Sequence, residues 1–155
     1  MSAVRGAPGV DERLLVFEIG GSLFALPIHG VLEVADLPGR ACIPTVPPEI
    51  AQVANFRGDA LPLMGGERLL PLERGANPDG ASILVLSDRA APVPRLGLPV
   101  DRVLGLVEGA GGKSAGGDPV AERRPWRGRL MHVVDPARLV ARAQEIIQDS
   151  LGASG

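Results

Sequence analysis

Short apolar runs separated by glycine and proline make up most of the first half of the chain. Residues 13–19 and 22–28 are two such runs on either side of Gly20-Gly21. This arrangement predicts a β-hairpin, because the favoured two-residue turns need positive φ. The apolar pattern over 30–37 predicts a further strand with Glu33 embedded in it.

The centre of the chain, VANFRGDALP at 53–62, places a single arginine between two apolar segments. The preceding segment 47–53 begins with two prolines and predicts a short helix, since proline fits the first helical turn. The run ending at Phe56 predicts a strand, Gly58-Asp59 a turn, and 60–64 the returning strand.

The second half of the chain continues with apolar runs that predict strands over 82–87, 94–101, 102–108 and 129–134. Residues 109–125 contain five glycines without periodicity and predict a flexible loop. Asp135 is expected to cap a helix that starts at Pro136. One face of this helix is apolar, formed by Leu139, Val140, Ala143, Ile146, Ile147 and Leu151. No sequence repeat with a period of 20–50 residues is found.

Composition narrows the class of protein. The chain has 155 residues, enough for one domain or two subdomains that share a core. A net charge of −2 and only four aromatic residues, one Trp and three Phe, argue against nucleic-acid binding. The lone Cys42 excludes an internal disulfide, and neither a secretory signal nor a membrane span is visible. We therefore expect a cytoplasmic protein without direct membrane insertion.

Candidate catalytic residues are isolated from one another. His29 and His132 each lie in an apolar segment, and Cys42 has no histidine nearby in sequence that would activate it. The stretch GAGGKSAGG at 109–117 lacks the spacing of a phosphate-binding loop. We expect no catalytic residue, no metal and no cofactor.

Four blocks, taken in order, resemble the CheW-type chemotaxis coupling family. They are LLVFEIGGSLFALPIHGVLEVADLP, IPTVPPEIAQVANFRGDALPL, SILVLSD with LGLPVDRVLGLVE, and GRLMHVVDPARLV. The second block contains the family's Asn-[Leu/Phe]-Arg-Gly centre, and the resemblance covers roughly residues 13–142. It implies a mostly β fold of two small SH3-like five-stranded barrels around a shared apolar core, with a C-terminal helix.

The resemblance also implies a domain division. We expect a flexible N-terminus over 1–11, a CheW-like domain over 12–150 and a flexible tail over 151–155. Within the domain, the first barrel is expected mainly over 22–75, the second over 12–20 plus 80–135, and the helix over 136–150.

The family's receptor-binding surface maps onto specific residues of this chain. Its glutamate and arginine correspond to Glu33 and Arg57, and Gly58 is expected in a tight turn. Val31, Val34, Val53 and Phe56 are expected to supply apolar contact area. From its sequence context alone, Arg57 has a simpler interpretation as a strand-end residue reaching water.

The implied function is that of a non-catalytic adaptor in a bacterial chemoreceptor array, in two-component signalling for motility. Its expected partner is the cytoplasmic domain of a methyl-accepting chemoreceptor. Binding to the regulatory domain of a CheA-type histidine kinase stays open. Gly65-Gly66 and a shortened approach to the last strand depart from the family pattern. Whether the second barrel is complete or trimmed therefore stays open, kinase binding is expected to be weak or absent, and a receptor-only variant is one form of the adaptor. A small β-barrel enzyme or ligand-binding protein is the alternative.

Overall fold

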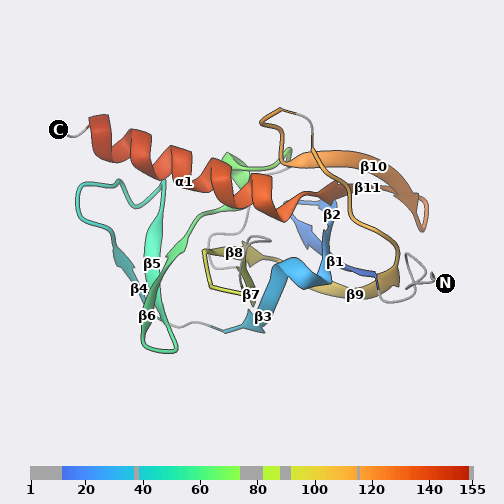
Figure 1. Cartoon of the computed structure of the whole chain (residues 1–155), viewed down its shortest axis with the longest axis horizontal. Helices are drawn as coiled ribbons and strands as arrows, with labels where there is room; N and C mark the ends of the chain where they lie inside the picture. Colours follow the sequence, from blue (N-terminus) through green and yellow to red (C-terminus); the bar gives the residue numbers. More distant parts are fainter. Residues whose placement is uncertain (1–11, 37–38, 74–81, 88–91, 115, 154–155) are drawn as a thin grey trace.

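Two β-sheets and one long helix make up the computed structural model, which describes residues 12–36, 39–73, 82–87, 92–114 and 116–153 (Figure 1). The first sheet has five strands in the order β10-β11-β2-β1-β9. These strands are β1 (Arg13–Ile19), β2 (Ser22–Pro27), β9 (Arg102–Glu108), β10 (Val120–Trp126) and β11 (Arg129–Val134).

The second sheet has six strands in the order β3-β7-β8-β6-β5-β4. They are β3 (Val31–Ala35), β4 (Arg40–Cys42), β5 (Gln52–Phe56), β6 (Asp59–Leu63), β7 (Ser82–Leu86) and β8 (Leu96–Val100). Two short 3₁₀ segments, Ile28–Gly30 and Gly66–Arg68, complete the described elements together with the helix α1 (Pro136–Ala153).

Three apolar clusters explain why the two sheets form one molecule. One cluster lies inside the six-stranded sheet and includes Phe56 and Leu61. A second lies inside the five-stranded sheet and includes Val16 and Met131. The largest joins the outer faces of both sheets to α1, because alternate residues of a strand point to opposite faces. The predicted mostly β fold of two small barrels around a shared apolar core is thus confirmed, with β4 as a short sixth strand in one barrel.

The strands are distributed between the barrels differently from the expectation. β2 was expected with the 22–75 barrel, but it pairs with β1 and β11. β7 and β8 were expected with the 80–135 barrel, but they pair with β3 and β6. Each half of the chain therefore gives one hairpin to the barrel that the other half completes. Apolar patterning identifies strands but carries no information on which barrel a hairpin joins.

Local structure agrees with the sequence at most turns. Gly20 and Gly21 both have positive φ between β1 and β2, as predicted. The segment expected as a helix over 47–53 makes only one turn, in which Ile50 N and Ala51 N donate to the Pro47 carbonyl.

The expected flexible loop over 109–125 is wrong in its last part, because β10 forms a full hairpin with β11. The second barrel is not trimmed. Gly66, which departs from the family pattern, is buried in a 3₁₀ turn where Leu69 N and Leu70 N donate to its carbonyl.

The C-terminal helix follows its sequence pattern. Pro136 is its first residue, and the Asp135 carboxylate accepts a hydrogen bond from Ala137 N at 3.1 Å, which caps the helix as predicted. Leu139, Val140 and Ala143 are buried in the shared core. The helix continues to Ala153, past the expected end at residue 150. The expected flexible segment 1–11 lies outside the described residues. Within the described part of the chain, no helix combines the length and apolar character needed to cross a bilayer.

Candidate functional site

The central arginine lies in the two-residue turn between β5 and β6. Arg57 has φ 53° and Gly58 has φ 89°, so both turn residues are left-handed, as the favoured hairpin turn requires. Glycine adopts this conformation freely, but an arginine there is uncommon and costs free energy. The Asn55 side chain supports the turn by accepting a hydrogen bond from Gly58 N at 2.9 Å.

Glu33 reaches the same place from the other side of the six-stranded barrel. It lies on the outer strand β3, directly after an irregularity in the pairing with β7. Arg57 Nη2 donates to Glu33 Oε1, and the two side chains form an ion pair. β4 pairs with β5 only over Gln52–Ala54, and the ion pair joins β3 to the turn that follows β5. The pair therefore links the two ends of the six-stranded sheet where it curves into a barrel. We call this junction between β3 and the β5–β6 turn the seam.

The Arg57 guanidinium is oriented but not buried. Its Cζ lies 4.9 Å from the centroid of the Phe56 ring, at a distance typical of a cation–π contact. Its side chain is 73% exposed and that of Glu33 is 35% exposed. The structure thus holds a charged group at the surface in a defined position, where a partner can reach it.

The predicted apolar residues divide into two groups. Val34 is 46% exposed, and Val53 is half-buried beside a shallow hollow of about 390 Å³ that Gly58 also lines. Val31 packs against the shared core. Phe56 is buried in the barrel interior, so the expectation that it supplies contact area is wrong. Its ring instead supports Arg57 from below.

Sequence reasoning missed Asn55, whose side chain fixes the turn. Asparagine commonly accepts hydrogen bonds from backbone amides that follow it, so the Asn-x-x-Gly spacing was an available signal.

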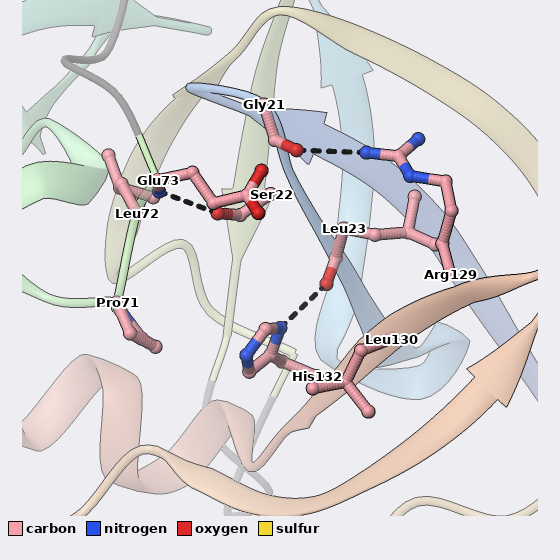
Figure 2. Close-up of a pocket in the computed structure, with 9 residues that line it drawn as sticks. All are labelled: Gly21, Ser22, Leu23, Pro71, Leu72, Glu73, Arg129, Leu130 and His132. Atoms are coloured by element: carbon pink, nitrogen blue, oxygen red, sulfur yellow. Dashed lines mark hydrogen bonds between the residues drawn. The ribbon is translucent and has the colours of Figure 1, made fainter.

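A pocket of about 470 Å³ beside the β1–β2 turn is the strongest candidate for enzymatic chemistry (Figure 2). Ser22, Glu73, Arg129 and His132 all line it. The Ser22 hydroxyl accepts a hydrogen bond from Glu73 N at 2.8 Å, and His132 Nδ1 lies 3.0 Å from the Leu23 carbonyl oxygen. No hydrogen bond joins Ser22 to His132 within the described residues, so the pocket lacks a paired nucleophile and base.

The other reactive side chains are also isolated. Cys42 is exposed on the short strand β4, and His29 is exposed in the 3₁₀ turn before β3. Among the described residues, no group of three or more potential ligands is placed to hold a metal ion.

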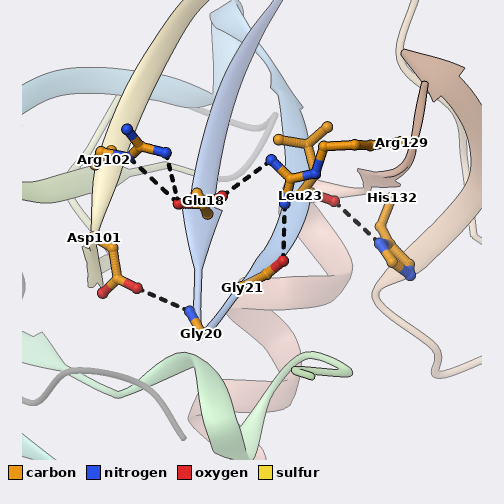
Figure 3. Close-up of polar contacts among 8 residues, drawn as sticks. All are labelled: Glu18, Gly20, Gly21, Leu23, Asp101, Arg102, Arg129 and His132. Carbon is orange, nitrogen blue, oxygen red and sulfur yellow. Dashed lines mark hydrogen bonds and ion pairs between the residues drawn. The ribbon is translucent and has the colours of Figure 1, made fainter. Parts of the chain in front are cut away.

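A second cluster of ion pairs lies around Glu18 in the five-stranded barrel (Figure 3). Glu18 on β1 pairs with Arg102 at 3.0 Å and with Arg129 at 3.0 Å, and its side chain is only 16% exposed. Burial opposes its ionisation, but the hydrogen bonds from Arg102 and Arg129 together hold the pKa of Glu18 below its ordinary range. Arg129 also donates to the Gly21 carbonyl, so the cluster ties three strands together and acts structurally.

Comparison with known proteins gives a consistent picture. A family model described as CheW-like domain matches residues 13–144. Among solved structures, the chain is similar to the scaffolding protein TtCheW from Thermoanaerobacter tengcongensis, with a TM-score of 0.64 and 18% sequence identity. That alignment covers 83% of this chain and 91% of the other. No curated protein sequence matches the chain.

Proposed function

The chain belongs to the CheW-like domain family, whose members are non-catalytic scaffold proteins of chemotaxis, and from this membership we propose that it is an adaptor of a bacterial chemosensory array. Its proposed partner is the cytoplasmic tip of a methyl-accepting chemoreceptor. It would act in the cytoplasm, where such tips lie. No catalytic step is needed for this role.

The single observation that supports receptor binding is the ion pair between Glu33 and Arg57 across the seam of the six-stranded barrel. Arg57 offers a planar guanidinium that holds a carboxylate in two parallel hydrogen bonds. Exposed Val34 lies next to Glu33 and adds apolar area. A receptor tip is a helical hairpin, and a helix that presents a carboxylate beside apolar residues matches this surface.

The completeness of both barrels supports the coupler form of this adaptor. The departures at Gly65-Gly66 and before the last strand left a receptor-only variant open. Gly66 is instead packed against Ile19, and β10 is a paired strand. Because these segments are already ordered, binding a partner there does not require the free energy that fixing a flexible backbone costs. We therefore propose that the protein also binds the regulatory domain of a histidine kinase.

Calorimetric titration of a receptor cytoplasmic fragment tests the proposal. Arg57→Ala is expected to weaken receptor binding by about 2 kcal/mol, because a desolvated interface arginine carries much of the binding energy. Its effect on folding is expected to be within about 1 kcal/mol, since the pair is exposed. Arg57→Lys keeps the charge but loses the bidentate fork, and should be intermediate.

The matched control is Arg123→Ala, which removes an exposed arginine from the other barrel. Receptor affinity should be unchanged in this variant. If folded Arg57→Ala binds the receptor as tightly as the unchanged chain does, the proposed site is wrong.

A further inference from the structure

The two barrels are built on one plan. The five strands β10-β11-β2-β1-β9 match β5-β6-β8-β7-β3 in order. In each set the pairings are antiparallel, parallel, antiparallel and antiparallel. Only β4 has no counterpart. A search for short sequence repeats does not detect this correspondence between the barrels, because the β1–β2 and β7–β8 hairpins each belong to the barrel formed mainly by the other half of the chain.

The match extends to single residues. β3 and β9 each contain one extra residue relative to the partner strand, Leu32 in β3 and Leu104 in β9. Alignment on these two residues superposes FALPIHGVLEV (24–34) on LGLPVDRVLGL (96–106) without a gap. Glu33 then corresponds to Gly105.

The turns of the two hairpins correspond as well. Trp126-Arg127-Gly128 joins β10 to β11, as Phe56-Arg57-Gly58 joins β5 to β6. Arg127 has φ 48° and Gly128 has φ 75°, so this turn is also left-handed at both residues. The Arg127 Cζ lies 4.4 Å from the centroid of the Trp126 ring, so the arginine is again oriented over the preceding aromatic side chain.

The two surfaces differ in one group, the carboxylate. Glu33 pairs with Arg57, whereas Gly105 has no side chain, and a Cβ at that position would meet nothing within 4 Å. Within the described part of the chain, no carboxylate forms an ion pair with Arg127. The flanking residues Val103 and Leu106 are 36% and 47% exposed.

The charge around the second turn is strongly positive. Residues 120–134 carry four arginines and one glutamate, in a chain with a net charge of −2. Arg124 forms an ion pair with Glu122 and donates a hydrogen bond to the Ala110 carbonyl, and Arg129 forms an ion pair with Glu18. Arg127 is exposed and forms no ion pair of this kind among the described residues. Its guanidinium is therefore available to a carboxylate of another protein.

We propose that Arg127, Val103 and Leu106 form a second docking surface, which binds an acidic amphipathic helix of a partner protein. Trp126 packs against the barrel interior and supports Arg127, as Phe56 supports Arg57. A carboxylate of that helix pairs with Arg127 where Gly105 leaves space, and its apolar side chains cover Val103 and Leu106. This goes beyond the receptor site proposed above and does not depend on it. The β5–β6 and β10–β11 turns lie at opposite ends of the molecule, so both surfaces are accessible together (Figure 1).

Both outer strands of this barrel favour a helix over an added strand as the occupant. β9 carries an irregularity at Leu104 that interrupts its row of backbone groups. β10 carries Pro125, which has no backbone N–H, and a second irregularity near Ala121. Because bulges and proline disfavour edge-to-edge pairing, the partner must bind through side chains.

Trp126 is the only tryptophan of the chain, so its fluorescence reports on this surface directly. The probe is a lactam-bridged amphipathic peptide with leucine and glutamate on one face, titrated into the full chain. We expect a saturable change in Trp126 emission, and weaker binding of the analogue in which glutamine replaces glutamate. A fluorescent label on the peptide provides an independent affinity by anisotropy.

Arg127→Ala should weaken peptide binding by about tenfold or more. Arg127→Gly removes the same charge while accepting positive φ, so it separates lost recognition from a distorted turn. Arg123→Ala is the matched control, because it removes an exposed arginine from the same hairpin and should change affinity less than about twofold. The change in Trp126 emission should persist in Arg57→Ala, because Trp126 lies against Arg127 and Arg57 lies on the other barrel, so this readout separates the second surface from receptor binding.

Three results would overturn the proposal. The first is no saturable binding of the acidic peptide. The second is an equal loss in Arg123→Ala and Arg127→Ala, which would indicate unspecific attraction to positive charge. The third is a concentration-dependent dimer in sedimentation that Arg127→Ala abolishes, which would make a second copy of this chain the occupant.

Discussion

Glutamate–arginine pairs serve different purposes in the two barrels. In the five-stranded barrel, Glu18 is largely buried and pairs with two arginines from different strands. In the six-stranded barrel, Glu33 pairs with one arginine that is mostly in solvent. The charges are alike, but burial and the number of partners differ. Exposure therefore separates the pair that we propose for partner binding from the pair that holds strands together.

The largest effect on stability is expected from a substitution in the apolar core that the two barrels share. Phe24 is fully buried in the shared core, 5.8 Å from Phe17 between ring centroids. Phe24→Ala is expected to lower the free energy of unfolding by about 3–5 kcal/mol, because a large cavity opens. Chemical denaturation should show one transition. Two separate transitions would mean that the barrels fold independently. Leu130→Ala, at an exposed position, is the control.

A smaller loss of folding stability is expected from filling a position at which one barrel has less internal space than the other. Gly97 on β8 corresponds to Ala25 on β2, and a Cβ at Gly97 would lie 2.3 Å from Leu63 Cδ2. Gly97→Ala is expected to cost about 1–3 kcal/mol through overpacking, although alanine usually stabilises a strand relative to glycine. Thermal unfolding measures the difference. If Gly97→Ala is instead more stable, the interior of the six-stranded barrel accommodates an extra methyl group and the expected overpacking is wrong.

The acid–base pairs themselves should differ in their effect on stability. Glu18→Gln is expected to cost about 1–2 kcal/mol at neutral pH, since two charge-assisted hydrogen bonds are lost. Glu33→Gln is expected to cost less than about 1 kcal/mol, because its pair is exposed. Equal costs for the two substitutions in denaturant titrations would remove the distinction drawn between the clusters.

The pH dependence sharpens the same difference. The folded state lowers the pKa of Glu18, so its stabilising effect is present above the ordinary glutamate pKa of about 4.3 and is lost as pH falls through the lower folded value. The stability gap between the unchanged chain and Glu18→Gln should therefore shrink as pH falls below about 4. Denaturation at several pH values measures it. A gap that stays constant or widens toward low pH would contradict the role given to Glu18.

The sequence predicted the strands and the helix of this fold better than their assembly. The Gly-Gly turn, the Asp135 cap and the apolar face of α1 depend on residues close in the chain, and each is confirmed, except that Leu151 at the end of the predicted face is exposed. The exchange of hairpins between barrels depends on contacts between distant segments, which periodicity does not encode. β10 was missed because VAERRPW contains a proline and three charges, although an outer strand tolerates both.

The candidate site was predictable in part. The resemblance to a family paired Glu33 with Arg57, and the structure joins them. It did not indicate that Phe56 is buried beneath the arginine, because strand alternation alone leaves open which face points inward. The second arginine–glycine turn received no attention, since only the three-dimensional match between the barrels relates Arg127 to Arg57.

The most direct test of the receptor-binding surface is amide NMR of the isotopically labelled chain, titrated with a receptor cytoplasmic fragment. The resonances of Val34, Arg57 and Gly58 are predicted to shift or broaden as the receptor is added, because these residues border the exposed ion pair. The account is contradicted if all three stay unchanged at saturation while resonances elsewhere respond.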